Sequence, residues 1–159
     1  MRHPTGEQYD IVSGAHRAVV TELGAGLRTY AVNGRDVVRG FGVDEAVKGG
    51  RGQQLLPWPN RIRDGRYTFA GVSQQLVLSE PKRHNASHGL ARYVPWNLLE
   101  HSDDRVSLRV AVYPQPGWTG ILEATTTYAV SDAGLQVHIE VVNDGPEAVP
   151  FGYGAHPYV

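Results

Sequence analysis

Residues 122–131 read LEATTTYAVS and alternate between two kinds of side chain. In an extended chain, Leu122, Ala124, Thr126 and Tyr128 lie on one face and the residues between them lie on the other. This two-residue period predicts a strand with one buried face.

Two further segments show the same period. Residues 106–112 place valine and leucine at every second position, and residues 135–141 do so with leucine, valine and isoleucine. The stretches SDAG at 131–134 and NDGP at 143–146 are typical of turns. Successive alternating strands joined by such turns predict an antiparallel sheet.

The N-terminal half contains shorter strand signals. Asn33-Gly34 and Ala70-Gly71 are two-residue hairpin turns, and residues 40–54, rich in glycine and charge, are expected to form a loop. Strands are predicted at residues 15–21, 27–32, 36–38, 67–69 and 74–78. No window has a convincing helical period, so we expect an all-β, antiparallel β-sandwich of about ten strands. Residues 1–159 are expected to form a single domain.

Composition narrows the classes of function. The 159 residues carry 15 basic and 16 acidic side chains, which leaves no charge excess for nucleic acid or an acidic membrane. There is no cysteine, so thiolate nucleophiles, thiolate metal sites and disulfides are excluded. The first ten residues contain no apolar signal region, and no apolar run approaches membrane-spanning length. We therefore expect a soluble, cytoplasmic protein with no nucleic-acid or membrane partner.

The stretch PWPNRIRDGRY at 57–67 is the stiffest part of the chain. Two prolines restrict the backbone before Asn60, and Asp64-Gly65 indicates a turn. Asn60, Arg61 and Arg63 are thus held on a rigid loop. Two interpretations stay open: a solvated arginine pair beside a hairpin, or polar groups positioned for a ligand.

The seven histidines fall into two groups. His3, His16, His101 and His138 are expected at the surface, at a chain end, at turns or on the polar face of a strand. His84, His88 and His156 lie among glycine, aromatic and proline residues instead. An imidazole that titrates near neutral pH on a stiff turn suits general acid–base catalysis, although a histidine bonded to loop carbonyls fits the same pattern.

Two kinds of site compete for these histidines. A metal site of the cupin type would use several histidines and a carboxylate, but His84 and His88 are four residues apart in non-helical chain and no His-x-His pair occurs. Metal-free binding of a neutral, polyhydroxylated ligand is favoured. Histidine, asparagine and arginine can hydrogen-bond its hydroxyl groups, and Trp58, Trp96, Trp118, Tyr93 and Tyr153 offer faces for its C–H groups.

Three motifs, in this order, resemble those of the aldose 1-epimerases, or galactose mutarotases. They are Asn60-Arg61-Ile62-x-x-Gly65-x-Tyr67-x-Phe69-x-Gly71, then Asn85-x-x-His88-Gly89 with Trp96, then Gly154-x-His156-Pro157-Tyr158. The resemblance extends from about residue 11 to the end. It implies a galactose mutarotase-like supersandwich that interconverts the α and β anomers of hexoses such as galactose or glucose without a cofactor or metal. His156 then matches the general acid, and His88 also matches a catalytic position. Arg61 and Asn60 match substrate-binding positions.

The resemblance also predicts that the chain is the N-terminal half of such a protein. The family's general base is a glutamate near the end of a chain of roughly twice this length. No glutamate follows His156 here. A sugar-binding or sensing module without turnover is therefore the alternative function. We also expect an open sandwich to be covered by a C-terminal half or by a second copy. A hexose phosphate held by Arg61, Arg63 and Arg83 is a further variant, which the balanced net charge opposes.

Overall fold

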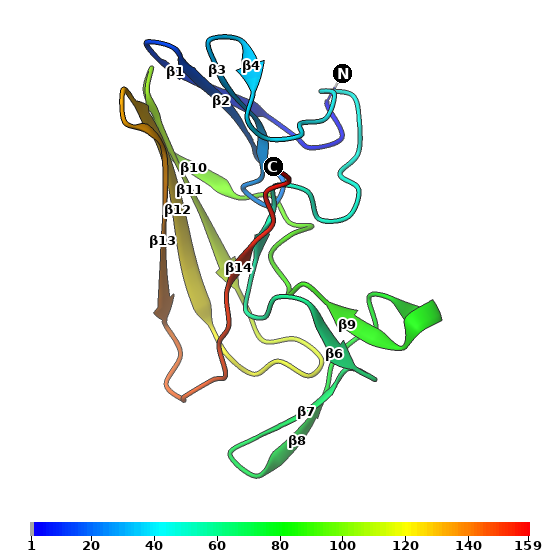
Figure 1. The fold of residues 1–159 in the computed structure, drawn as a ribbon. Helices are drawn as coiled ribbons and strands as arrows, with labels where there is room; N and C mark the ends of the chain where they lie inside the picture. Colours follow the sequence, from blue (N-terminus) through cyan, green and yellow to red (C-terminus); the bar gives the residue numbers. More distant parts are fainter. Residues whose placement is uncertain (1) are drawn as a thin grey trace.

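Two four-stranded antiparallel sheets form the body of the protein, which the computed structural model describes for residues 2–159 (Figure 1). The first sheet has the order β1 (Gln8–Ser13), β2 (His16–Thr21), β3 (Leu27–Val32) and β4 (Arg35–Asp36). The second has the order β10 (Asn97–His101), β11 (Arg105–Val112), β12 (Leu122–Ser131) and β13 (Gly134–Asn143). The predicted all-β, antiparallel fold is confirmed.

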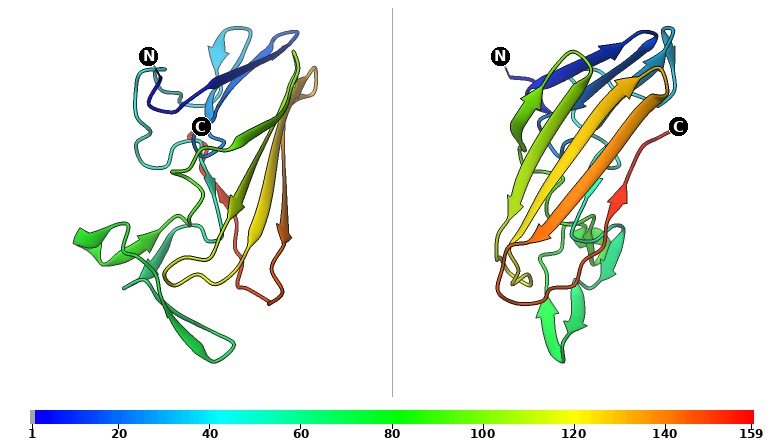
Figure 2. Two further views of the ribbon diagram at one scale, coloured as in Figure 1. Left: turned by 180° about the vertical axis from the view of Figure 1, so that it is seen from behind. Right: turned by 90° about the vertical axis from the view of Figure 1, so that its left-hand side faces the viewer.

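Three short strand pairs and one turn of helix complete the described residues. The pairs are β5 (Gln54–Leu55) with β14 (Gly154–Ala155), β6 (Arg61–Arg63) with β9 (Asn85–Ser87), and β7 (Arg66–Phe69) with β8 (Val72–Gln75). The 3₁₀ helix η1 spans Pro81–Arg83. Figure 2 shows β10 to β13 side by side and the β7–β8 hairpin projecting from the body. None of the helical segments within residues 2–159 is long and apolar enough to cross a membrane.

The core lies between the two large sheets. Strands β1 and β2 contact β12, and Ile11, Val20, Leu108 and Tyr128 are all at most 1% exposed there. The alternation predicted for residues 122–130 is confirmed, because alternate side chains of β12 are fully buried. Burial of apolar surface of this kind is the main stabilising contribution to a sandwich.

The strand β13 differs from its expected burial. The apolar side chains at positions 135, 137, 139 and 141 were expected to be buried, yet Val137 is 42% exposed and the others are only partly buried. The physical reason is position, since β13 is an edge strand of its sheet. The expectation that a C-terminal half or a second copy covers this open sandwich stays a prediction.

Several local predictions need correction. The strand expected at 74–78 is β8, which begins at Val72 and ends at Gln75. Ser107 lies between the apolar positions of residues 106–112, so the alternation predicts it on the outer face. It is only 6% exposed, and its hydroxyl group lies 2.8 Å from that of Thr127 on the next strand. His16, expected at the surface, is half-buried, with its Nδ1 2.9 Å from the Tyr30 hydroxyl group. The local sequence does not predict strands β1, β5, β6, β9, β10 and β14.

Candidate functional site

A cavity of about 510 Å³ lies between two of the short strand pairs, β5–β14 and β6–β9. All four predicted site residues line it, although they come from segments far apart in the sequence. Those residues are Asn60, Arg61, His88 and His156, and Glu80, Arg92 and Tyr158 line the cavity with them. The structure therefore brings the predicted residues together, while their chemical roles stay a prediction.

The end of the β6–β9 ladder sets the position of His88. Arg61 pairs with Ser87, and beyond this pair Asn60 and His88 both adopt left-handed backbone conformations, with φ of 55° and 61°. Asparagine and histidine tolerate this region better than most residues. The His88 N–H donates to the Asn60 carbonyl over 2.8 Å. Gly89 follows with φ of 72°, where a Cβ would lie 2.0 Å from the Leu56 carbonyl oxygen, so only glycine fits.

A backbone hydrogen bond fixes the tautomer of His88. The Asn60 N–H donates to His88 Nδ1 over 3.1 Å, so a neutral His88 carries its proton on Nε2. Burial lowers the pKa of His88, and the positive charges of Arg92, His156 and Arg61 lower it further. The negative charge of Glu80 raises the pKa of His88 and so offsets part of this effect. His88 is thus a neutral N–H donor at neutral pH.

We expect the imidazole of His88 to titrate below the ordinary histidine value of 6.5. Protonation must break the bond from the Asn60 N–H, so the neutral form is favoured in the folded state. The stability contributed by His88 is then present above pH 6.5 and is lost as the pH falls through its lowered pKa. A two-dimensional ¹H–¹⁵N NMR titration measures both the pKa and the tautomer. A pKa above 6.5, or a proton on Nδ1 in the neutral form, would contradict this assignment.

The backbone of β14 and its neighbour holds His156. Gly154 pairs with Leu55, the His156 N–H donates to the Gln53 carbonyl over 3.3 Å, and the His156 carbonyl accepts from Gly52 over 2.8 Å. The imidazole lies edge-to-face with that of His88, with 5.5 Å between ring centroids. Within residues 2–159 the histidine ring nitrogens that make hydrogen bonds are those of His3, His16, His88 and His101, and those of His156 make none. They are therefore free to bind a substrate or transfer a proton.

Arg61 is held in place by a neighbouring carboxylate. Glu80 accepts two hydrogen bonds from Arg61, of 2.6 and 3.0 Å, and Asn60 Oδ1 accepts a third of 3.2 Å. The bonds to Arg61 are the main cause of a lowered pKa at Glu80, which keeps it ionised. Nothing in the local sequence indicates this pair, because it depends on the pairing of β6 with β9.

Some sequence candidates lie outside the cavity. His84 ends helix η1 in a left-handed conformation and is exposed, and neither Arg63 nor Arg83 lines the cavity. The aromatic residues expected to face a sugar are also elsewhere, so that expectation is wrong. Trp58 and Trp118 line a separate groove, Trp96 is in the core, Tyr93 stacks under Arg92, and the Tyr153 hydroxyl group bonds Gln54. Tyr158, which the motif contains, supplies the aromatic ring.

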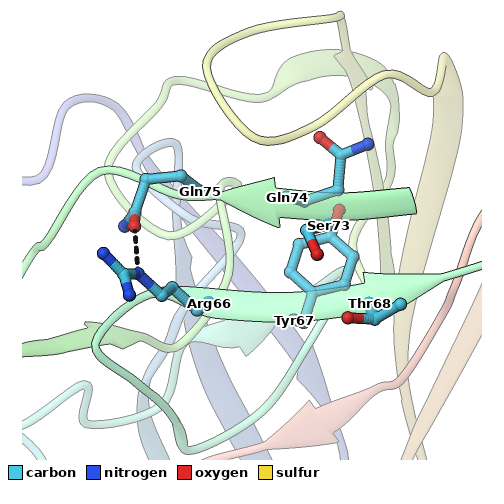
Figure 3. A pocket seen from close by; sticks show the side chains of 6 residues that line it. All are labelled: Arg66, Tyr67, Thr68, Ser73, Gln74 and Gln75. Atoms are coloured by element: carbon cyan, nitrogen blue, oxygen red, sulfur yellow. Dashed lines mark hydrogen bonds between the residues drawn. The ribbon is translucent and has the colours of Figure 1, made fainter. Parts of the chain in front are cut away.

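Another hollow, of about 450 Å³, lies on the β7–β8 hairpin and holds none of the predicted residues (Figure 3). Arg66 and Gln75 bond one another across it over 3.0 Å, and the Tyr67 hydroxyl group donates to the Gly117 carbonyl. The side chains of Arg66, Tyr67 and Gln75 are thus already bonded within the protein. Among residues 2–159, no group of three or more histidine or acidic side chains is placed to hold a metal ion.

Comparison with known proteins decides the family. The model of the aldose 1-epimerase family matches residues 7–159. The chain belongs to this family. It is 32% identical to the uncharacterized protein YihR of Escherichia coli K12 over 158 residues, which are 99% of this chain and 51% of YihR. It is 30% identical to the uncharacterized protein YphB of the same organism over 104 residues, which are 65% of this chain and 35% of YphB.

Solved structures of this family have the same fold. A putative aldose 1-epimerase from Escherichia coli K12 gives a TM-score of 0.83 at 23% identity, over 95% of this chain and 51% of that one. A galactose mutarotase-like protein from Clostridium acetobutylicum gives a TM-score of 0.81 at 19% identity, over 93% of this chain and 49% of that one. The predicted family and the galactose mutarotase-like fold are confirmed. The chain spans about half the length of YihR and of these solved structures.

Proposed function

We propose that this cavity binds a hexose and that its side chains take part in interconverting the α and β anomers of the sugar. The observation that carries the proposal is the arrangement of His88, His156 and Arg61 around one cavity, with the two imidazoles in edge-to-face contact. Membership of the aldose 1-epimerase family supports it. Galactose and glucose are the reference substrates.

The reaction opens and recloses the sugar ring. A base removes the proton of the C1 hydroxyl group, and the bond between C1 and the ring oxygen breaks. Its electron pair goes to the ring oxygen, which takes a proton from an acid. Rotation about C1–C2 and the reverse steps give the other anomer. One acid and one base must therefore flank the sugar, each with a pKa near the working pH.

The geometry favours different roles for the two histidines. The ring nitrogens of His156 make no hydrogen bond within residues 2–159, which suits the acid that gives its proton to the ring oxygen and takes one back. His88 has Nδ1 bonded to the Asn60 backbone and a lowered pKa, which suits a neutral donor to a sugar oxygen. Arg61 would polarise the same region as a fixed cation, and Asn60 orients both neighbours.

We place the general base on a residue outside residues 2–159. Glu80 is the carboxylate that lines the cavity, but both its oxygens accept hydrogen bonds from Arg61 and its pKa is lowered. A carboxylate in that state is a weak base. Glu123 and Glu140 lie on β12 and β13, away from the cavity.

The test is the rate of anomeric exchange of glucose and galactose, measured by NMR. Residues 1–159 should be assayed alone and again with a separately made C-terminal half of a related mutarotase. We expect acceleration over buffer with the second half and little without it. A rate equal to buffer in both cases, with saturable sugar binding, would instead favour a sugar-binding module. Absence of binding would contradict both functions.

We expect Glu80→Gln to weaken the site through Arg61. The variant loses a bidentate ion pair, so Arg61 is no longer held beside His88. The side chains of Arg61 and Glu80 are 38% and 25% exposed, so solvent screens the ion pair. We therefore expect a loss of only roughly 3- to 10-fold in kcat/KM. Glu100→Gln is the matched control, since it removes the carboxylate of the exposed Arg105–Glu100 pair. Equal effects of the two changes would contradict a role for Glu80.

A further inference from the structure

Arg92 is a buried cation with no acidic partner within residues 2–159. It is 8% exposed and lines the cavity. Its backbone is fixed, because Gln53 Nε2 donates to the Arg92 carbonyl over 2.6 Å and Trp96 Nε1 donates to the preceding Ala91 carbonyl over 3.1 Å. Within residues 2–159, however, no carboxylate lies within ion-pair distance of its guanidinium group, and no side-chain or backbone oxygen accepts a hydrogen bond from it.

The guanidinium nitrogens are not among the fully buried polar atoms that lack a partner, so they face the cavity, where water or a ligand supplies the acceptors. A guanidinium group stays charged and has five N–H donors. Removing such a charge from water costs free energy unless it is paired. The contact of Arg92 with the Tyr93 ring, 4.4 Å from guanidinium carbon to ring centroid, offsets part of this cost. It satisfies none of the N–H donors, which border the cavity beside Gly50.

The charges of the residues that line the cavity also indicate a local excess of positive charge. Arg61 and Glu80 neutralise one another, which leaves Arg92 as the uncompensated charge among the lining residues. Its effect already reaches the predicted site, because the Arg92 charge is among the causes that lower the pKa of His88. The overall charge of −1 does not oppose an anionic ligand, since the excess positive charge is local.

From this geometry we infer that the sugar carries an anionic group, a phosphoryl or carboxylate group, and that Arg92 binds it. A planar guanidinium group matches such oxygens with two parallel hydrogen bonds. The inference rests on the proposed function, because it names the class of hexose that the same cavity takes. The inference also assigns a different residue to phosphate binding from the three arginines expected for a hexose phosphate. Arg63 and Arg83 do not line the cavity, and Arg61 is already paired.

The experiment compares four probes by isothermal titration calorimetry with residues 1–159 at fixed pH and ionic strength: glucose, glucose 6-phosphate, glucuronate and inorganic phosphate. We expect one of the two anionic sugars to bind about 10- to 100-fold more tightly than glucose, as charge-assisted hydrogen bonds allow. The comparison of glucose 6-phosphate with glucuronate shows whether the preferred anionic group is a phosphoryl or a carboxylate group. Equal affinity for glucose and both anionic sugars would overturn the inference, as would inorganic phosphate binding as tightly as the sugar phosphate.

Variants of Arg92 make the test specific. Arg92→Gln should remove the preference for the anionic sugar, Arg92→Lys should restore part of it, and Arg105→Gln, on the exposed face of β11, should leave it unchanged. If Arg92→Gln does not fold, the ¹⁵Nε resonance of Arg92 in the unaltered protein gives the answer. It should shift on addition of the anionic sugar and not of glucose. The absence of such a shift would overturn the inference.

Anomeric exchange separates this inference from the proposed function. If glucose and the anionic sugars exchange at equal accelerated rates, and Arg92→Gln slows all of them alike, the function stands and the inference is wrong. If no sugar exchanges faster than in buffer, yet an anionic sugar binds with a dependence on Arg92, the epimerase proposal fails and the ligand class stands.

Discussion

His156→Ala is expected to lower the kcat of anomeric exchange by roughly 10²- to 10⁴-fold, the usual contribution of a general acid–base group. The apparent affinity for the sugar should change little, because proton transfer to the ring oxygen matters in the transition state and not in the bound ground state. No residue in the described part of the chain forms a hydrogen bond with the ring nitrogens of His156, so the imidazole can contact the sugar directly. NMR exchange rates at saturating sugar, with the C-terminal half present, measure kcat.

Two comparisons make this result specific to His156. His138 is exposed on the outer face of β13, so His138→Ala should leave the rate unchanged. His88→Ala and Arg61→Ala should lower both kcat and apparent affinity, because these side chains would contact the sugar before it reacts. If His156→Ala lost affinity without losing kcat, His156 would not be the general acid. A loss in His138→Ala as large as that in His156→Ala would do the same.

The long strands could be predicted because their information is local. In β12 the two-residue period is complete over residues 122–130, and every second side chain is buried as expected. The strands β6 and β9 are three residues each and exist only through pairing with one another across the sequence. No local pattern distinguishes the Arg61–Arg63 segment from a solvated loop. Prediction of this part would require knowledge of its partner.

The candidate site divides in the same way. Motif order identified His88, His156, Arg61 and Asn60, and the structure places all four around one cavity. The sequence does not indicate the roles of Glu80 and Arg92, because neither belongs to a recognisable motif. The role of Glu80 comes from its ion pair with Arg61, and that of Arg92 from having no ion-pair partner within residues 2–159. A charged residue's environment is set by which segments meet, and that cannot be deduced from spacing.

Trp96 connects the core to the candidate site. Its side chain is 1% exposed in the main core, and its Nε1 donates to the Ala91 carbonyl over 3.1 Å. That bond closes the turn that carries Arg92, and the Trp96 backbone N–H in turn donates to the Glu22 carbonyl over 2.9 Å. The same side chain therefore stabilises the sandwich and fixes the position of the cavity's unpaired cation.

Trp96→Ala is expected to lower the free energy of unfolding by about 3–5 kcal/mol, the usual cost of removing a buried tryptophan. Domains of this kind have only about 5–15 kcal/mol in total, so the variant should unfold at much lower urea concentration. Trp96→Phe keeps most of the buried area but leaves the Ala91 carbonyl without its donor, which should cost about 1–3 kcal/mol. Tyr113→Ala, at a side chain that is 64% exposed, should stay within about 0.5 kcal/mol of the unaltered protein. Urea titrations followed by circular dichroism measure all three. A cost for Trp96→Ala no greater than that for Tyr113→Ala would show that this tryptophan does not stabilise the fold.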